Sequence, residues 1–175
     1  GILGMGRIGR KVAARASAFG MEIIYHSRRQ DHPEIETGLN AIFYENLDAM
    51  LPDIDILSIH TPHTPDTFHL IDSNRLNLLN SSAFIINTAR GEVIDQKALI
   101  RSLRAKKIAG AGLDVYEGGR NVSPELKTFK NVFLLPHMSS ATVEGRIEMG
   151  EKVIVNIKTL ADGHRPPDQV LPSML

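Results

Sequence analysis

The stretch Gly4-Met5-Gly6-Arg7-Ile8-Gly9 decides the fold of this chain. It follows the apolar residues Ile2 and Leu3 and leads into a helical pattern over residues 7–19. A strand, a Gly-x-Gly-x-x-Gly turn and a helix in this order are the layout of a dinucleotide-binding turn. The first glycine permits the tight turn, the second lets a pyrophosphate approach the backbone, and the third lets helix and strand pack closely. We therefore predict a nucleotide site formed by Gly4, Gly6, Arg7, Ile8 and Gly9.

Short apolar runs alternate with helical patterns along the whole chain. The helix over residues 7–19 should be amphipathic, with Ile8, Val12, Ala16 and Phe19 on one side. The polar stretch 28–40 contains a proline and a glycine and is predicted to be a loop. Further strands are expected at 21–26, 41–44, 54–60, 83–87, within 108–115 and at 132–135, and helices at 45–51, 72–79, 95–106 and 142–161. This alternation predicts an α/β fold, a doubly wound parallel sheet of the Rossmann type in a single domain over residues 1–175.

Composition excludes several classes of partner. The chain has 175 residues, with 20 Lys and Arg against 20 Asp and Glu, so its net charge is zero. The sequence has no basic stripe of the kind that binds nucleic acid, and it has no basic amphipathic helix of the kind that binds a membrane surface. The absence of cysteine fits a reducing compartment, and we expect a cytoplasmic protein. Because Gly1 already lies inside the first strand, the chain is expected to be a piece of a longer protein.

The tip of the second strand predicts the cofactor. An Asp or Glu at this place binds both ribose hydroxyls and selects NAD, but the strand ends in Ser27-Arg28-Arg29. A hydroxyl and two guanidinium groups would instead bind a 2′-phosphate, because the planar arginine fork suits phosphate. Taken alone, the segment could equally be an ordinary solvated basic loop. Behind a glycine turn at this distance, it predicts a preference for NADP, with NAD as the alternative.

Four further segments, each at the end of a predicted strand, complete a pattern: residues 60–67 (HTPHTPDT), 87–91 (NTARG), 111–117 (AGLDVYE) and 134–142 (LLPHMSSAT). Together with the glycine turn they resemble the cofactor domain of the D-isomer-specific 2-hydroxyacid dehydrogenases, over almost the whole chain. The Ser27-Arg28-Arg29 tip is most similar to the glyoxylate/hydroxypyruvate reductase branch. The resemblance implies a second, substrate-binding domain built mostly from sequence before the glycine turn, toward which the tail from about residue 162 would pack. It also implies a homodimer formed through the cofactor domain.

Reduction of a 2-keto acid requires a hydride donor, a cation for the substrate carboxylate and an acid that protonates the keto oxygen. The resemblance makes Arg90 the carboxylate-binding arginine and His137 the general acid, and both residue types suit these tasks. Without the pattern, Arg90 would be a surface arginine and His137 a capping histidine. By the same resemblance, the remaining cofactor contacts are Thr61, Pro62, Thr67, Thr88, Ala89, Asp114 and Ser140, the last of which could equally be a helix cap.

One position departs from the family pattern. The family continues its sixth-strand motif as Asp-Val-(Phe/Tyr)-Glu-x-Glu-Pro, and the second Glu pairs with the histidine and raises its pKa. Here that position is Gly119, while Glu117 matches the first, normally non-catalytic Glu. Either Glu117 swings in on the Gly118-Gly119 hinge, or catalysis is weakened, or the sequence is changed at this site.

The sequence therefore predicts the cofactor domain of an NADP-dependent enzyme that reduces a small 2-keto acid such as glyoxylate or hydroxypyruvate. An NAD-linked phosphoglycerate or D-lactate dehydrogenase is the first alternative, and a nucleotide-binding or oligomerisation module without turnover is the second. A zinc site at His60, His63 and His69 is rejected because of the prolines between them, so no metal is expected. The apolar side of the 142–161 helix is predicted to be a core or dimer contact.

Overall fold

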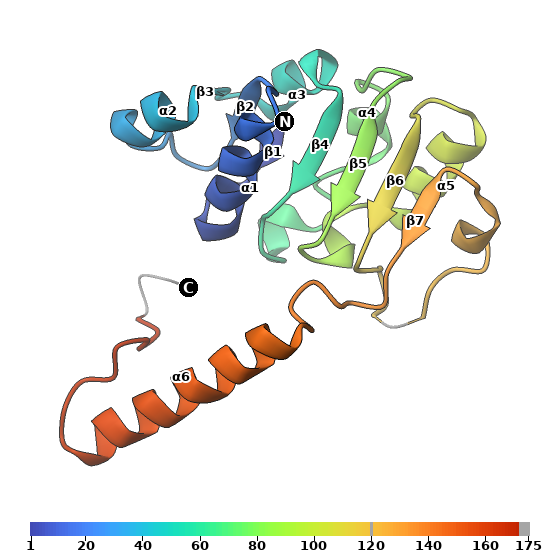
Figure 1. Cartoon of the computed structure of the whole chain (residues 1–175). Coiled ribbons are helices and arrows are strands. Elements are labelled where there is room, and N and C mark those ends of the chain that lie inside the picture. The colour runs from blue at the N-terminus through green and yellow to red at the C-terminus, as the bar shows by residue number, and fades with distance from the viewer. Residues whose placement is uncertain (120, 172–175) are drawn as a thin grey trace. The chain divides into compact units, whose positions relative to one another are not determined.

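The computed structural model describes residues 1–119 and 121–171 and contains a seven-stranded parallel sheet with the strand order β3-β2-β1-β4-β5-β6-β7 (Figure 1). The strands are β1 (Ile2–Leu3), β2 (Ile23–His26), β3 (Ala41–Phe43), β4 (Ile56–Ile59), β5 (Phe84–Asn87), β6 (Gly110–Leu113) and β7 (Val132–Leu134). The chain runs outward from β1 to β3 and then crosses back to β4, so the order reverses between β1 and β4. This topology confirms the predicted doubly wound fold.

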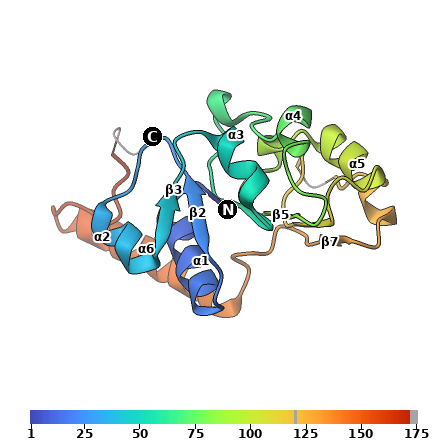
Figure 2. The same cartoon turned by 90° about the horizontal axis from the view of Figure 1, so that it is seen from above.

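Helices lie on both faces of the sheet, although Phe84 of β5 and Phe133 of β7 remain 45% and 68% exposed. Figure 2 shows α1 on one face and α3, α4 and α5 on the other. The helices of this part of the chain are α1 (Arg7–Ala18), α2 (Pro33–Leu39), α3 (Leu47–Met50), α4 (Ser73–Leu76) and α5 (Gln96–Arg104). The larger core cluster includes Leu57, Ile85 and Leu99, whereas a smaller one under α1 includes Ile23 and Ala13.

The face on which α1 packs differs from the prediction. Ile8 and Phe19 are 66% and 86% exposed, and the buried residues of the helix are Gly9 and Ala13. Because these two residues are small, the helix axis can lie close to β1, and the contact row shifts to them and to the half-buried Val12. Val12 and Ala16 pack against the smaller core cluster as predicted, whereas the prediction was wrong for Ile8 and Phe19.

The stretch predicted as a loop contains a helix, α2, at its end. Pro33 occupies the first turn, where its missing N–H costs nothing, and Glu34 and Glu36 complement the positive end of the helix dipole. Asn40 ends the helix in a left-handed conformation with φ of 48°. None of the residues of α2 is fully buried, so the polar composition that suggested a loop belongs to a surface helix.

The chain divides into two compact units, Gly1–His137 and a second one that begins at Met138. The second unit contains α6 (Val143–Ala161), which Thr142 caps by accepting a hydrogen bond from Gly145 N at 3.0 Å. The following segment returns along this helix, where Asp168 accepts from Asn156 Nδ2 at 2.9 Å. No residue of α6 is buried.

Candidate active site

The glycine turn lies at the carboxyl ends of β1 and β4, where the strand order reverses and where open α/β sheets bind ligands. Gly4 has a φ of +96°, and a Cβ there would lie 3.0 Å from the His60 carbonyl oxygen. A Cβ on Gly9 would lie 2.1 Å from the Gly4 carbonyl oxygen, which explains the close approach of α1 to the turn. Around Gly6, by contrast, a Cβ would meet no atom within 4 Å. The first and third glycines therefore serve the fold, while the second leaves space for a ligand.

The amino end of α1 opens onto that space. Its N-cap is Gly6, no side chain caps it, and no acidic residue occupies its first turn. The amides of Arg7, Ile8 and Gly9 belong to the first turn, where helical N–H groups have no partner within the helix. With the helix dipole, these amides can hold a phosphate group.

The tip of β2 is tied to the glycine turn. Met5 N donates to Ser27 Oγ at 2.7 Å, and Arg10 Nε donates to the Met5 carbonyl at 3.2 Å. Arg10 also binds the Asp31 carboxylate through two hydrogen bonds of 2.8 and 2.6 Å, an ion pair that the sequence analysis missed. Arg10 thereby compensates the negative charge of Asp31 next to the tip of β2.

Arg28 and Arg29 follow Ser27 and are exposed. Within residues 1–119 and 121–171, neither side chain forms a hydrogen bond or an ion pair. Both guanidinium groups can therefore bind an anion at the outer end of the glycine turn.

The segment after β4 contributes a buried hydroxyl. Thr61 lies beside the turn, because a Cβ on Gly4 would be 3.1 Å from Thr61 Cγ2. Its Oγ1 is buried and has no hydrogen-bond partner among the described residues. An orphaned buried hydroxyl is costly and fits a site that a polar ligand completes.

The other predicted residues of this segment shape the loop. Thr67 Oγ1 donates to the Pro62 carbonyl at 2.7 Å and also accepts from Thr64 N at 2.8 Å. Upstream, Ser58 Oγ and His60 Nε2 share a hydrogen bond of 2.8 Å, and burial lowers the pKa of His60. Thr67 and Pro62 thus hold the loop in place.

Asn87, a residue that the sequence analysis did not assign to the site, shapes the loop after β5. It is buried, its Nδ2 donates to the Arg90 carbonyl at 2.9 Å, and its Oδ1 accepts from Ala89 N at 3.0 Å. Thr88 and Arg90 are exposed on this loop, and Arg90 Nη1 donates to the Ala89 carbonyl at 2.6 Å. The signal available in the sequence for this role was an asparagine at the end of a predicted strand, directly before a turn.

A cavity of about 440 Å³ brings the predicted chemical groups together at the ends of β5, β6 and β7. It is lined by Arg90, Gly91, Glu92, Asp114, Val115, Tyr116, Gly119, Val122, Pro136 and His137. Asp114 is buried, whereas His137 is exposed and has a φ of +56°, in the left-handed region. The Tyr116 hydroxyl donates to the Leu135 carbonyl at 2.6 Å and so ties the end of β6 to the end of β7. The cavity thus offers a guanidinium for a carboxylate and an imidazole for proton transfer.

Glu117 does not line this cavity. His69 Nε2 donates to its Oε1 at 2.8 Å, and Gln96 N donates to its Oε2 at 3.2 Å. The carboxylate thus joins the loop after β4 to the amino end of α5. Gly118 and Gly119, with φ of +81° and +82°, continue the turn beyond it. Ser140 belongs to the unit that begins at Met138.

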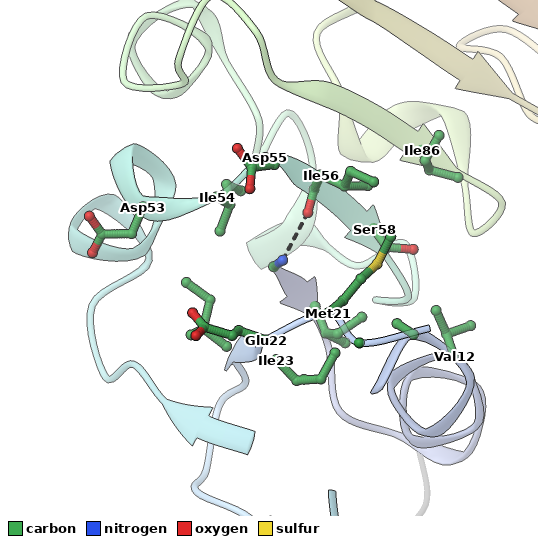
Figure 3. Close-up of a pocket in the computed structure, with 15 residues that line it drawn as sticks. Val12, Met21, Glu22, Ile23, Asp53, Ile54, Asp55, Ile56, Ser58 and Ile86 are labelled. Atoms are coloured by element: carbon green, nitrogen blue, oxygen red, sulfur yellow. Dashed lines mark hydrogen bonds between the residues drawn. The ribbon is translucent and has the colours of Figure 1, made fainter. Parts of the chain in front are cut away.

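A second cavity, of about 650 Å³, lies at the amino ends of β1, β2 and β4 (Figure 3). The backbone nitrogen of Gly1 donates to the Ile56 carbonyl at 2.8 Å here. Apolar side chains such as Val12 and Ile86 line most of it, and Glu22, Asp53 and Asp55 are its acidic residues. It contains none of the predicted site residues and lies at the sheet edge opposite the glycine turn.

Two features of the described residues bear on other classes of function. No helix in residues 1–119 and 121–171 is long and apolar enough to cross a bilayer. In the same residues, no cluster of three or more His, Asp or Glu side chains could hold a metal ion. His60 and His69 are instead bonded to Ser58 and Glu117.

Comparison with known proteins agrees with this geometry. Residues 1–139 match the family model described as D-isomer specific 2-hydroxyacid dehydrogenase, NAD binding domain. A glyoxylate reductase of Thermococcus litoralis is 45% identical over 170 residues, which are 97% of this chain and 51% of that protein. The chain thus spans about half the length of the curated relatives that it matches.

Solved structures give the same result. An NADPH-dependent glyoxylate/hydroxypyruvate reductase from Sinorhizobium meliloti, in complex with NADP and malonate, matches with a TM-score of 0.84 and 38% identity over 90% of this chain and 48% of that one. The NAD-complexed D-isomer specific 2-hydroxyacid dehydrogenase of Lactobacillus delbrueckii matches with a TM-score of 0.87 and 32% identity over 97% of this chain and 54% of that one. This chain therefore belongs to the D-isomer specific 2-hydroxyacid dehydrogenases and contains their NAD binding domain.

Proposed function

We propose that the protein is an NADP-dependent reductase of a small 2-keto acid such as glyoxylate or hydroxypyruvate. The observation that carries the proposal is the cavity that holds Arg90 and His137 together at the carboxyl edge of the sheet on which the glycine turn also lies. A nicotinamide cofactor supplies a hydride when bound. The residues of this chain must then bind the substrate, orient it and deliver a proton.

The cofactor fits the residues present. The space at Gly6 admits a pyrophosphate, the first turn of α1 offers free amides, and Thr61 Oγ1 is an unpaired buried hydroxyl beside the turn. Arg28 and Arg29 carry the preference for NADP, because each can bind the 2′-phosphate that distinguishes NADP from NAD. The NADP complex of the Sinorhizobium relative supports this preference, and the NAD complex of the Lactobacillus relative is the reason to test it.

Arg90 and His137 divide the chemistry on the substrate. The Arg90 guanidinium binds the substrate carboxylate through a bidentate pair, which fixes the keto carbon in the cavity. As the keto carbon gains a hydride, its oxygen gains negative charge, and protonated His137 donates its proton to that oxygen. The product is the 2-hydroxy acid, and His137 is left neutral. In the oxidative direction, neutral His137 takes the proton back.

The cofactor preference is tested by titrating NADPH and NADH against the unmodified chain, Arg28→Ala and a matched control, Arg101→Ala. Arg101 is an exposed arginine on α5, so its loss changes the net charge equally. Arg28→Ala should weaken NADPH binding by roughly ten- to a hundredfold, since a hydrogen bond to a charged group contributes about 1.5–3 kcal/mol. NADH binding and the control should change little. Equal affinity of the unmodified chain for both cofactors would instead favour an NAD-linked dehydrogenase.

A further inference from the structure

We propose that Glu92 is the positioning residue of His137: its carboxylate pairs with the imidazole and favours the protonated, correctly oriented ring. The inference rests on the proposed function, because it concerns the proton donor of the same cavity. It concerns a side chain to which neither the sequence pattern nor the comparisons give a role.

The backbone of Glu92 is fixed against the cavity from several sides. It lies in a single 3₁₀ turn, Gly91–Val93, that packs directly on the turn after β6. A Cβ on Gly91 would lie 2.0 Å from the Tyr116 carbonyl carbon, so the two backbones are in contact. The Glu92 carbonyl accepts from His69 N at 2.8 Å. Glu92 is thereby held next to the Tyr116–Gly119 turn, and it lines the same cavity as His137.

The cavity has room for a carboxylate beside the imidazole. A Cβ on Gly119 would meet no atom within 4 Å, so that part of the wall is open. Among the residues that the structure describes, the charged or titratable side chains that line the cavity with His137 are Arg90, Glu92, Asp114 and Tyr116. The Tyr116 hydroxyl is bonded to carbonyl oxygens.

The acidic groups near the cavity are not equally available. Asp114 is buried, and its side chain is not free. Both oxygens of Glu117 accept hydrogen bonds from other elements. Glu92 is half-buried, and its carboxylate has no hydrogen-bond or ion-pair partner among the described residues. It is therefore the carboxylate that can approach His137 without breaking an existing contact.

A carboxylate in this position changes the chemistry of the imidazole in two ways. It stabilises the imidazolium and so favours the protonated ring, the form that can donate a proton to the keto oxygen. It also accepts from one ring nitrogen and so leaves the other N–H directed at the substrate. The proton that reaches the keto oxygen still comes from His137, so Glu92 acts through it.

The test measures the pKa of His137 directly. The ring protons of the chain as it stands are followed by NMR against pH, and the His137 signal is assigned with His137→Gln. Glu92→Gln should lower the proton affinity of His137 about three- to tenfold. Glu92→Asp, which keeps the charge, should retain part of the effect. Glu117→Gln is the matched control and should change the titration of its partner His69 while leaving His137 unchanged.

The readout separates this inference from the proposed function. The titration needs neither cofactor nor turnover, so a shift in Glu92→Gln supports the pairing even if no reductase activity is found. An unchanged His137 titration in Glu92→Gln overturns the pairing, even in an active enzyme. In that case the carboxylate of Glu92 would instead pair with the guanidinium of Arg90, which lines the same cavity.

Discussion

Alanine substitution at two glycines of the same turn should separate the folding role of the turn from its binding role. A methyl carbon at Gly9 would lie 2.1 Å from the Gly4 carbonyl oxygen, whereas a close carbon–oxygen contact is about 3.3 Å. Gly9→Ala thus requires backbone to move by more than about 1 Å. That backbone is pinned, because Gly4 N donates to the His26 carbonyl at 2.9 Å. The cost should lie at the upper end of overpacking, about 3 kcal/mol.

For a chain of this size, about 3 kcal/mol lowers the midpoint of thermal unfolding by about 6–12 °C. Gly6→Ala should leave the midpoint within about 2 °C, since the new methyl meets no atom within 4 Å and the backbone there is extended. The same methyl blocks the approach of a pyrophosphate, so Gly6→Ala should bind NADPH at least about tenfold more weakly, a loss of about 1.4 kcal/mol.

Calorimetry and a fluorescence titration with NADPH measure the two effects on the same preparations. The reasoning fails if Gly9→Ala unfolds at the temperature of the unmodified chain. It also fails if Gly6→Ala is folded and binds NADPH with undiminished affinity, because the space at Gly6 would then not be the pyrophosphate site.

Two further substitutions test the supports of the site. Asp95→Ala removes the side chain that accepts from Ala98 N at 2.9 Å, and the loss of this N-cap should lower the free energy of unfolding by about 1 kcal/mol in denaturant titration, with NADPH affinity little changed. Burial lowers the pKa of His60 in the folded chain, so its contribution to stability is complete above about pH 6.5 and is lost as the pH falls through the lowered value. His60→Gln should flatten the decline in stability on the acid side of this pH, and the exposed His164→Gln should not; identical pH profiles for the two variants would contradict this assignment.

The doubly wound parallel sheet could be predicted because short apolar runs alternate with helical patterns along the chain. The same signal failed at α2, where a proline, two glutamates and a left-handed asparagine form a helix that buries no residue fully. Polar composition indicates that a segment is exposed. The residues that begin and end a helix must also be considered to distinguish a surface helix from a loop. The face of α1 was mispredicted because Gly9 and Ala13, the residues of closest approach, carry little hydrophobic signal.

The site was predictable to the extent that its residues follow strands. The ends of parallel strands lie at one edge, so Arg90 and His137 were expected together, and the structure places both on one cavity. Contacts between side chains distant in sequence could not be read in this way. The binding of Glu117 by His69, and of Asp31 by Arg10, depends on how loops from different strands fold over that edge. No periodicity encodes such pairs.

The left-handed backbone of His137 lowers the stability of the fold but directs the side chain for its proposed chemistry. At φ of +56° a residue with a side chain is strained by about 1–2 kcal/mol, which glycine would avoid. The strain holds the Cβ in one direction and thereby fixes where the imidazole begins. A redesign of this chain that optimised stability alone would replace His137 by glycine or asparagine and would gain a more stable protein without its proposed proton donor. Position 137 should thus be excluded from any such redesign, and backbone strain of this kind can mark the residues that a stabilisation effort ought to leave untouched.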